Sequence, residues 1–563
     1  MKKIPIGVDN FKKIIDGDYY YVDKTLMIKE VLEAGSDASL ITRPRRFGKS
    51  LNMSMLKYFF EDSHELNGEE DSYGYLFDDL NISKETCIDE QGKYPVIALT
   101  FKSCKTNTWE RTYSKIIREI TNEFKRHKYI LKDSNLDQDD IDTFNAIIKG
   151  QANIDDYEDS LLLLSKMLKI HHKQPCIILL DEYDVPLQNS HIEDFYDDAI
   201  EFVRNLFTAT FKQNDYMNFG VITGCLRVSK ESIFTGWNNV DMQTVVGDLY
   251  LSSFGITVTE KDSLLQEYDM KDEDDLIKQW YDGYNFSGIE IYNPWDLLSY
   301  VRNKKMNPDR TPQSYWIGTS SNDILNELLV TKSDAIKKGI KLLIAGEEIE
   351  HKISESLTYK NLQSESDNIW SILLFTGYLT GVLYDKDNKV YKLRIPNKSI
   401  KQCYIEQIDS YNKSQIKPGI ARNLEQYLIK NKAKAINELL NEYLNSTLSY
   451  YDDIEAYYHG LLTALCSEFP SYKVESNKEA GTGRADIVLT PIDDDTLPGI
   501  ILELKYKKTE TNLQNIAQKA YDQINDKKYF RTFGLYNKKI VRKYGIAFSK
   551  KTCKVANKKS ENK

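Results

Sequence analysis

"SLITRPRRFGKSLNMSMLKYFF", residues 39–60, joins a short apolar segment to a helix-forming one through a Gly-Lys-Ser. This tripeptide matches the second half of the phosphate-binding pattern G-x-x-x-x-G-K-[ST], in which a strand leads through a loop into a helix. The first glycine of that pattern would fall at Arg43, and the loop interior reads Pro-Arg-Arg-Phe. The stretch therefore predicts a strand, a loop and a helix. It leaves open whether the loop holds a nucleotide or is a basic turn of similar shape.

Four apolar segments recur between residues 38 and 260, and long helix-forming stretches separate them. They read SLITRP, YPVIALTFK, CIILLDE and NFGVITG. Continuous apolar runs of this length, separated by helices, indicate parallel strands that are covered on both faces. The sequence therefore predicts the α/β class for residues 1–260, with a parallel sheet flanked by helices.

The composition changes after this region. Residues 261–395 are helix-forming and aromatic, with punctuating Gly and Asn-Pro, which predicts a helical or winged lid subdomain. Residues 396–450 are rich in Lys and Asn and predict a helical connector. Residues 451–550 read as a helix, three strands, a long helix and a last strand, which predicts a restriction-endonuclease-like α/β domain. Residues 551–563 are expected to be a frayed basic tail.

The bulk composition narrows the class of protein. A chain of 563 residues with 41% hydrophobic and 28% charged residues is expected to form several globular domains. The net charge of -10 argues against a generally basic nucleic-acid binder but permits a local basic groove. We expect no secretory signal, and the sequence has no apolar run near 20 residues and no Cys-x-x-Cys among the seven cysteines. We expect a cytoplasmic protein without a membrane span, with reduced thiols.

The Gly-Lys-Ser segment supplies groups that a nucleotide needs. Gly48 permits the positive φ that turns backbone N–H groups inward, and the next helix directs its positive dipole end at the loop. Lys49 would reach the phosphates and the Ser50 hydroxyl would complete a Mg²⁺ shell. The strand in PCIILLDEYD ends in two acids. Asp181 is expected to hold Mg²⁺ through water, and Glu182 to polarise the attacking water, as in ASCE-type P-loop sheets.

Further residues extend the predicted nucleotide site. Arg45, Arg46 and Phe47 belong to the loop, and the two arginines add positive charge that could offset the missing glycine. A solvated turn or contacts to a nucleic-acid backbone are the alternatives for them. Thr223 lies where a polar side chain would act as a sensor of the γ-phosphate. Arg227 could stabilise negative charge in the transition state, either in its own subunit or in a neighbouring one. A buried Thr and a surface Arg without such roles are equally compatible with the sequence.

The C-terminal region carries GTGRADIVLT and then GIILELKYKK. In a strand, Glu503 and Lys505 lie on the same face and point where Asp486 of the neighbouring strand points. The carboxylates of Asp486 and Glu503 would bind Mg²⁺, with the Leu504 carbonyl as a third oxygen. Lys505 would steer or deprotonate the water that attacks a phosphodiester. This arrangement predicts a metal-dependent nuclease site.

Other groups are expected near the same site. Glu455, on the helix before the sheet, could supply another carboxylate, with His459 one turn further on the same face. Gln523, on the helix after the third strand, would lie over the site. The alternative is a surface ion pair between Glu503 and Lys505. IILELKY is otherwise a buried strand, however, and an acid and a base inside it are costly unless a metal or partners compensate.

Together these segments resemble bacterial AAA-ATPase-like proteins with a C-terminal nuclease domain of the PD-(D/E)XK superfamily. The resemblance covers nearly the full length, and it is carried by IPIGVDNFKKIIDGDYYYVDKTLMIKEVLE, RPRRFGKSL, LLDEYDVPL, LRVSKESIFTGWNN, WYDGYNF, YNPWDLL, YHGLL, GTGRADIVL and ELKY. It makes Arg43 a family trait and implies ATP and Mg²⁺ as cofactors. It also maps the superfamily's metal-binding and catalytic residues onto Asp486, Glu503 and Lys505. An alanine precedes this aspartate where the namesake motif has proline.

Two sites for phosphate chemistry in one chain favour a specific hypothesis. It is an ATP-binding protein, expected to be an ATPase, coupled to a Mg²⁺-dependent nuclease that acts on DNA in defence or in maintenance of mobile DNA. One alternative is a nucleotide-sensing interaction protein whose nuclease-like domain binds nucleic acid or a partner without cleaving. Another is a pure ATPase that acts on protein partners. An arginine acting in trans would require a homo-oligomer, which the sequence leaves open.

Overall fold

The computed structural model of the chain describes residues 1–64, 73–227, 240–316, 334–355, 366–414, 419–446, 455–480, 483–492, 494, 496–507, 511–529, 535 and 540–557. The chain forms two compact units. The first comprises Met1–Ser320 and Glu348–Ile400, and the second comprises Ser321–Glu347 and Lys401–Lys563. This division differs from the expected boundaries at residues 260 and 395. Most of the expected lid belongs to the first unit.

A five-stranded parallel sheet forms the core of the first unit. Its order is β2-β3-β4-β1-β5, and its strands are β1 (Ala38–Thr42), β2 (Val96–Thr100), β3 (Cys176–Asp181), β4 (Met217–Gly224) and β5 (Val240–Gln243). Every residue of β1 and β3 is buried, which explains their continuous apolar sequences. β4 lies between the strand of the phosphate loop and the strand of the two acids, as in an ASCE-type sheet. The predicted α/β class is confirmed, whereas the half-buried edge strand β5 was not predicted.

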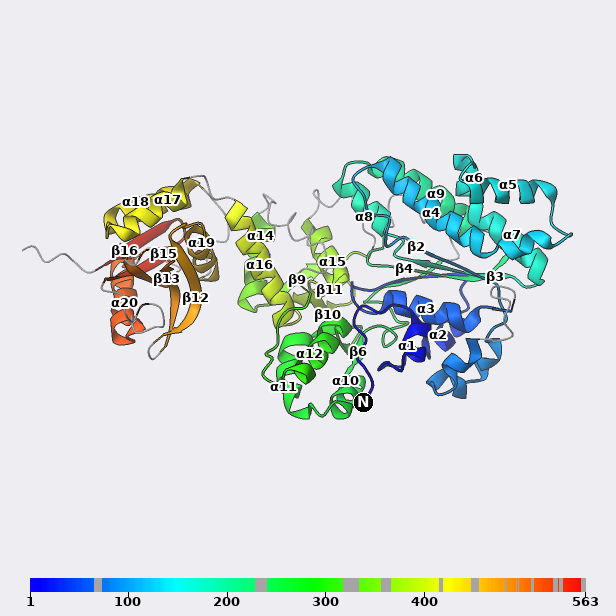
Figure 1. Ribbon diagram of the computed structural model, residues 1–563, viewed down its shortest axis with the longest axis horizontal. Helices are drawn as coiled ribbons and strands as arrows, with labels where there is room; N and C mark the ends of the chain where they lie inside the picture. The colour runs from blue at the N-terminus through cyan, green and yellow to red at the C-terminus, as the bar shows by residue number, and fades with distance from the viewer. Residues whose placement is uncertain are drawn as a thin grey trace, which may run out of the picture. The chain divides into compact units, whose positions relative to one another are not determined.

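Helices cover both faces of this sheet, with α1, α2 and α3 on one side and α4, α7, α8 and α9 on the other (Figure 1). α4 begins after Thr108, whose side chain accepts the Arg111 N–H, and it buries an apolar stripe at helical spacing. The helices of this part of the unit are α1 (Phe11–Asp16), α2 (Met27–Ala34), α3 (Lys49–Phe60), α4 (Trp109–Arg126), α5 (Gln138–Lys149), α6 (Ile154–Glu158), α7 (Ser160–His172), α8 (Val185–Ile192) and α9 (Tyr196–Phe211).

The rest of the first unit combines helices with two small antiparallel sheets. One sheet has the order β6-β8-β7 and the other has the order β10-β11-β9. The sequence led us to expect mainly helices here, and the short strands of the first sheet were not predicted. The elements are β6 (Ile256–Thr257), α10 (Val258–Glu267), α11 (Asp274–Tyr281), β7 (Tyr284–Phe286), β8 (Ile289–Tyr292), α12 (Pro294–Met306), β9 (Ile349–Lys352), α15 (Ser366–Thr376), β10 (Thr380–Asp385) and β11 (Val390–Arg394).

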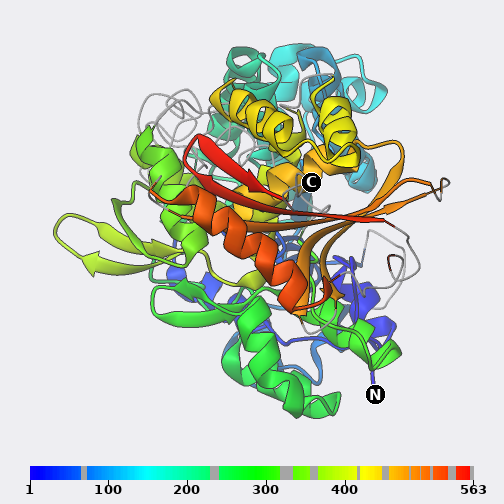
Figure 2. The ribbon, with the colours of Figure 1, turned by 90° about the vertical axis from the view of Figure 1, so that its left-hand side faces the viewer.

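The second unit contains a mixed five-stranded sheet of order β12-β13-β14-β15-β16. β14 pairs parallel with β15, and the other neighbours pair antiparallel. Figure 2 shows α20 lying across one face of this sheet. The predicted strands and the long helix after the third of them are present. The elements are α14 (Asp334–Ala345), α16 (Lys398–Ser414, whose first three residues belong to the first unit), α17 (Ile420–Ile429), α18 (Ala433–Ser446), α19 (Glu455–Ser467), β12 (Tyr472–Ala480), β13 (Gly483–Pro491), β14 (Gly499–Tyr506), α20 (Leu513–Asp526), β15 (Val541–Ser549) and β16 (Thr552–Ala556).

The strand β16 replaces the frayed tail that the lysine-rich sequence led us to expect from residue 551. Its outer edge is covered by α18, because the Asn441 side chain accepts the Cys553 N–H at 2.8 Å and donates to the Cys553 carbonyl at 3.2 Å. An amide side chain thus takes the place of a neighbouring strand and protects the sheet edge.

Residues 558–563 lie outside the described part of the chain. No helix within the described ranges is long and apolar enough to cross a lipid bilayer.

Candidate functional site

The phosphate loop joins β1 to α3 at the carboxyl edge of the first sheet. Gly48 precedes α3 with φ +89°, a conformation that side chains other than that of glycine rarely adopt, and Arg46 has φ +71°. In the described structure no side chain caps the start of α3. Its first backbone N–H groups therefore remain available to an anion, and the helix dipole favours negative charge there.

Lys49 occupies the centre of this loop, with its side chain 3% exposed. Its Nζ donates to the carbonyls of Arg43 and Pro44 at 3.2 and 3.3 Å and to Cys225 Sγ at 3.3 Å, and it lies 3.5 Å from Glu182 Oε1. Burial by itself lowers the pKa of Lys49, but the acidic groups around it, led by Cys225 and Glu182, raise the pKa above its ordinary value. The loop therefore holds a fixed positive charge.

Ser50, Asp181 and Thr223 form a hydrogen-bonded group beside Lys49. Ser50 Oγ donates to Asp181 Oδ2 at 2.6 Å, and Thr223 Oγ1 donates to Asp181 Oδ1 at 2.8 Å. Burial, and then the charge of Glu182, raise the pKa of Asp181. A buried carboxylate next to the Ser hydroxyl is the donor set that suits a hydrated Mg²⁺ beside a nucleotide. These predicted residues therefore lie together and fit the expected ion.

The other two acids of the DEYD segment have different surroundings. Glu182 adopts φ +55° at the end of β3. Asp184 is 1% exposed, and its Oδ2 accepts the backbone N–H groups of Cys225 and Leu226, both at 2.9 Å. Burial, and then the charge of Glu182, raise the pKa of Asp184 to about 6. Asp184 thus fixes the segment after β4. Sequence reasoning missed it because an acid before a helix looks like an ordinary N-cap.

Arg227 follows that fixed segment, and its Nε is buried without a hydrogen-bond partner in the described part of the chain. Residues 228–239, which carry the rest of LRVSKESIFTGWNN, lie outside the described residues. The role of Arg227 in charge stabilisation stays a prediction.

Arg43, which stands in place of the first motif glycine, serves as an anchor. It is fully buried, and the ring of Phe254 lies 5.3 Å from its guanidinium carbon. Burial lowers its pKa to about 9. Its guanidinium donates at 2.8–3.0 Å to four main-chain carbonyls, those of Thr42, Gln243, Leu249 and Tyr250. The side chain therefore ties β1 to the end of β5 and to the chain that follows β5.

Restoring the motif glycine should damage the protein. Arg43→Gly is expected to destabilise the first unit by about 3 kcal/mol or more, because four main-chain carbonyls, two of them in buried hydrogen bonds, lose their donor. All six tryptophans precede residue 371, so their fluorescence during urea unfolding reports on the first unit. The exposed Arg118→Gly on α4 is a matched control and should cost about 1 kcal/mol. Equal stability of the two variants would contradict the anchoring role.

The remaining loop residues contact three different elements. Arg45 Nη2 donates to Gln188 Oε1 of α8 at 2.7 Å. The guanidinium of Arg46 lies over the ring of Trp295, 4.2 Å from its centroid, and Phe47 is buried against aromatic side chains of β7. These contacts hold the loop in shape. The direct contacts to a nucleotide that the sequence predicts for the three residues stay predictions.

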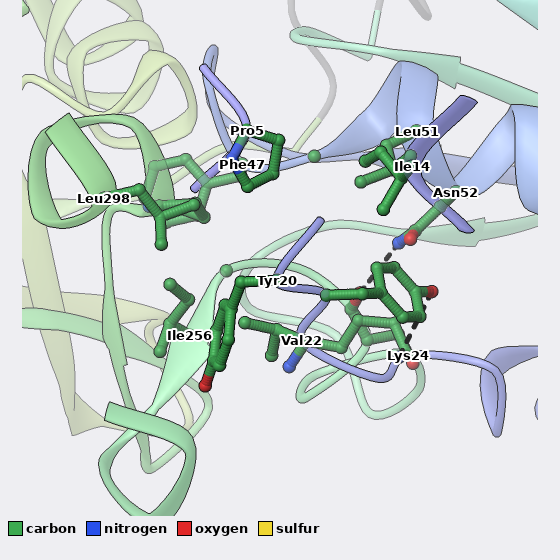
Figure 3. Close-up of a pocket in the computed structure, with 15 residues that line it drawn as sticks. Pro5, Ile14, Tyr20, Val22, Lys24, Phe47, Leu51, Asn52, Ile256 and Leu298 are labelled. Carbon is green, nitrogen blue, oxygen red and sulfur yellow. Dashed lines mark hydrogen bonds between the residues drawn. The ribbon is translucent and has the colours of Figure 1, made fainter. Parts of the chain in front are cut away.

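A cavity of about 80 Å³ lies beside Gly48 (Figure 3). Its wall is mainly apolar and includes Pro5, Ile14, Tyr20, Val22, Leu51 and Leu298. A slot of this kind next to a phosphate loop suits a flat aromatic base. Sequence reasoning missed the cavity because its wall combines the N-terminal segment, α3 and α12. The aromatic run in DGDYYYVD was the available signal.

The candidate nuclease site in the second unit lies where β13 and β14 separate. The two strands pair only between residues 487–489 and 500–502. Beyond that point the Leu504 N–H donates to Asp486 Oδ2 at 2.7 Å, so a side chain replaces the backbone partner. The N–H and C=O of one strand residue point to the same side. The Leu504 carbonyl therefore faces the gap that holds the Asp486 carboxylate, as a metal site requires.

Glu503 is the buried acid of this site, with 1% of its surface exposed. Its Oε1 lies 3.3 Å from Lys505 Nζ and accepts from Gln523 Nε2, while Oε2 is buried and has no partner among the described residues. Burial, and then the charge of Asp486, raise the pKa of Glu503 to about 7. Two carboxylates held together in this way are stabilised by a cation. Asp486 and Glu503 thus fit a divalent ion.

The helix α20 brings Gln523 to Glu503. A Cβ on Gly545, which pairs in register with Glu503, would lie 2.1 Å from the Ala517 carbonyl, so the helix rests directly on the sheet at this glycine. Gln523 Nε2 also donates to the hydroxyl of the buried Tyr529 at 3.2 Å. Sequence reasoning missed Tyr529 because a tyrosine one turn after a helix looks like an ordinary core residue.

The groups expected from α19 are placed differently. His459 Nε2 lies 3.1 Å from the main-chain oxygen of Asp486 and 3.2 Å from Ser476 Oγ. His459 therefore contacts the backbone of β13 rather than the Asp486 carboxylate. Glu455 is the first residue of α19, but its side chain lies outside the described part of the structure. Its role as a further carboxylate stays a prediction.

Comparisons with known proteins match two different domains in the chain, one around each candidate site. Residues 5–234 match the family model described as "Predicted AAA-ATPase", and residues 453–558 match the "PD-(D/E)XK nuclease superfamily". The chain is also 26% identical over 407 residues to a protein of Azotobacter chroococcum mcd 1 named "Uncharacterized protein in vnfD 5'region", a match that covers 71% of this chain and 68% of that protein. The chain thus combines an AAA-ATPase-like domain with a C-terminal domain of the PD-(D/E)XK nuclease superfamily.

Proposed function

We propose that the protein binds and hydrolyses ATP with Mg²⁺ in its first unit and cleaves DNA phosphodiesters with Mg²⁺ in its second unit. One observation carries the proposal: in each unit a lysine lies within 3.5 Å of a carboxylate, and a second carboxylate stands beside this pair, Asp181 in the first unit and Asp486 in the second. Both activities belong in the cytoplasm, where ATP and Mg²⁺ are abundant. They would suit defence or the maintenance of mobile DNA.

In the first unit, Lys49 and the N–H groups at the start of α3 would bind the phosphates. Ser50 and Asp181 would hold the Mg²⁺ shell, and the apolar cavity would take the base. When bound, Mg²⁺ neutralises charge on the phosphates. A phosphate that draws Lys49 toward itself competes with Glu182 for that ammonium. Glu182 would then be free to orient a water molecule in line with the γ-phosphate.

In the second unit, Asp486, Glu503 and the Leu504 carbonyl would hold Mg²⁺. When bound, the metal stabilises charge on the scissile phosphate and lowers the pKa of a coordinated water. Lys505 Nζ lies 3.3 Å from Glu503, and its side chain is 36% exposed, so it reaches from the acid toward solvent. That position suits a group that orients or deprotonates the attacking water. Gln523 keeps the Glu503 side chain in place.

Removing Lys505 tests this assignment. We expect Lys505→Ala to lower the rate at which the full chain cleaves linear double-stranded DNA in Mg²⁺ by about 10²-fold, because the water loses its positioning group. Lys507→Ala removes an exposed lysine just after the same strand and should leave the rate unchanged. If the wild type binds DNA and ATP but cleaves no substrate with any divalent ion, the alternative of an interaction protein is correct.

A further inference from the structure

The proposed function gives no role to the aromatic side chains of two segments, WYDGYNF and YNPWDLL. Both contact the phosphate loop. The ring of Phe47 lies 5.0 Å from that of Tyr284, edge to face, and 5.5 Å from that of Phe286. The Arg46 guanidinium lies 4.2 Å from the centroid of the Trp295 ring. One aromatic segment thus holds Phe47 and the other holds Arg46.

The same segments also hold the first turn of α16. Asn397, which precedes that helix, donates from Nδ2 to the Asp282 carbonyl at 2.7 Å. Gly283 has φ +97°, and a Cβ on it would lie 2.1 Å from the Pro396 carbonyl. Only a glycine therefore lets the chain before α16 lie at this place. Residues 282 and 283 thus contact the two residues that lead into α16, while Tyr284, next in the chain, contacts the loop.

The second segment repeats this arrangement. Ser399, in the first turn of α16, donates from Oγ to Asp296 Oδ2 at 2.7 Å. Both side chains are buried, and Asp296 Oδ1 has no partner within the described ranges. Burial raises the pKa of Asp296 to about 7. The Ser399 bond is thus made to a buried acid that is next in sequence to the Trp295 that carries the loop contact.

We propose that these two segments couple the phosphate loop to α16, with Tyr284 and Trp295 as positioning residues for the loop and Asp282 and Asp296 as anchors for the helix. The coupling rests on the proposed binding of a nucleotide at this loop. α16 spans Lys398–Ser414, so it begins in the first unit and continues into the second. The helix that leads to the nuclease-like domain is therefore held by the residues that hold the loop.

The physical basis is shared packing. A bound triphosphate orders the loop and, with it, the aromatic rings of the two segments that pack on the loop. In each segment a residue next to the aromatic one holds the start of α16. The order of the loop therefore stabilises the hydrogen bonds at the start of that helix. The first turn of α16 is expected to open less often when the loop is occupied. By linkage, loosening that turn should weaken nucleotide binding by the same factor.

Hydrogen exchange of the full chain measures this effect. In wild type, a saturating concentration of ATP with Mg²⁺ should slow deuterium uptake of the peptide 396–404 by about threefold or more. Ser399→Ala removes the buried bond to Asp296 and should abolish the slowing, while the affinity for ATP falls by less than about tenfold. Ser263→Ala on α10 removes an exposed hydroxyl that donates to its own helix, and should respond like wild type.

A second pair of variants tests whether the coupling needs the aromatic face of Trp295 or only an apolar side chain at that position. Trp295→Phe keeps an aromatic face for Arg46 and should retain the slowing of uptake, whereas Trp295→Leu should lose it. If calorimetry shows that wild type binds ATP while uptake of 396–404 is unchanged, the coupling is overturned and the nucleotide site stands. If wild type does not bind ATP, the proposed function fails, and the coupling fails with it.

Discussion

Glu503→Gln is expected to lower Mg²⁺-dependent DNA cleavage by about 10³-fold or more and, in metal-free buffer at pH 8, to stabilise the second unit. The two effects have one cause. Glu503 is buried beside Asp486 with an unpartnered oxygen, so its negative charge is unfavourable until a cation arrives. The amide has nearly the same shape and no charge. It relieves the repulsion and removes a metal ligand.

The pH dependence of stability follows from the pKa of Glu503. Its ordinary value of 4.5 rises to about 7 in the folded chain. Between these values the folded state binds more protons than the unfolded state. The stability that this group contributes is therefore complete below pH 4.5 and is lost as the pH rises through 7. The loss amounts to roughly 3 kcal/mol by pH 8.

Differential scanning calorimetry in a chelator, between pH 5 and pH 8, measures this loss. The transition of the second unit should move to lower temperature with rising pH in wild type, and the shift should be smaller in Glu503→Gln. Glu468→Gln replaces an exposed acid of the same unit and should behave like wild type. A Glu503→Gln protein that is less stable than wild type at pH 8 without metal would show that the ionised carboxylate of Glu503 does not destabilise the folded second unit.

Lys49→Ala is expected to weaken ATP binding by about 10³-fold in titration calorimetry, which corresponds to about 4 kcal/mol. Lys49 Nζ lies inside the loop on two main-chain carbonyls, and its acidic neighbours keep it charged. Without this ammonium the phosphates would meet Glu182 and Asp181 uncompensated, because both acids lie beside Lys49 at the carboxyl end of β3. Repulsion then adds to the lost attraction.

The binding measurement is informative only if the Lys49→Ala protein remains folded. Lys49→Ala also leaves Glu182 without its cation, so tryptophan fluorescence during urea unfolding should be recorded for each variant. Lys57→Ala, two turns further along α3, is the matched control and should bind ATP like wild type. A folded Lys49→Ala protein whose affinity stays within threefold of wild type would exclude the loop as the phosphate site.

Local patterns in the sequence were sufficient for most of the fold and for bringing together the residues at the centres of both candidate sites. Four apolar runs predicted β1 to β4, and the acids at the end of the third run predicted Asp181 at the sheet edge. The period of two in a strand placed Glu503 and Lys505 on one face, and the structure has them 3.3 Å apart. These predictions depend on short spacings, which the backbone geometry determines.

The missed features depend on contacts between distant segments. Arg43 reads as a loop arginine, yet three of its four carbonyl partners lie about 200 residues further along the chain. Asp184 and Tyr529 have ordinary local patterns, and their roles come from β4 and Gln523. The strand β16 is short and surrounded by lysines, and it is stabilised by Asn441 of α18. No local pattern predicts such pairings.

Cleavage of linear DNA by the full chain, with Mg²⁺ and with a chelator, tests the central claim most directly. We predict that wild type cleaves in Mg²⁺ and not in the chelator, and that Glu503→Gln is at least about 10³-fold slower in Mg²⁺ while remaining folded. Cleavage that persists in the chelator, or that Glu503→Gln performs at the wild-type rate, would contradict a metal-dependent site formed by Asp486, Glu503 and Lys505.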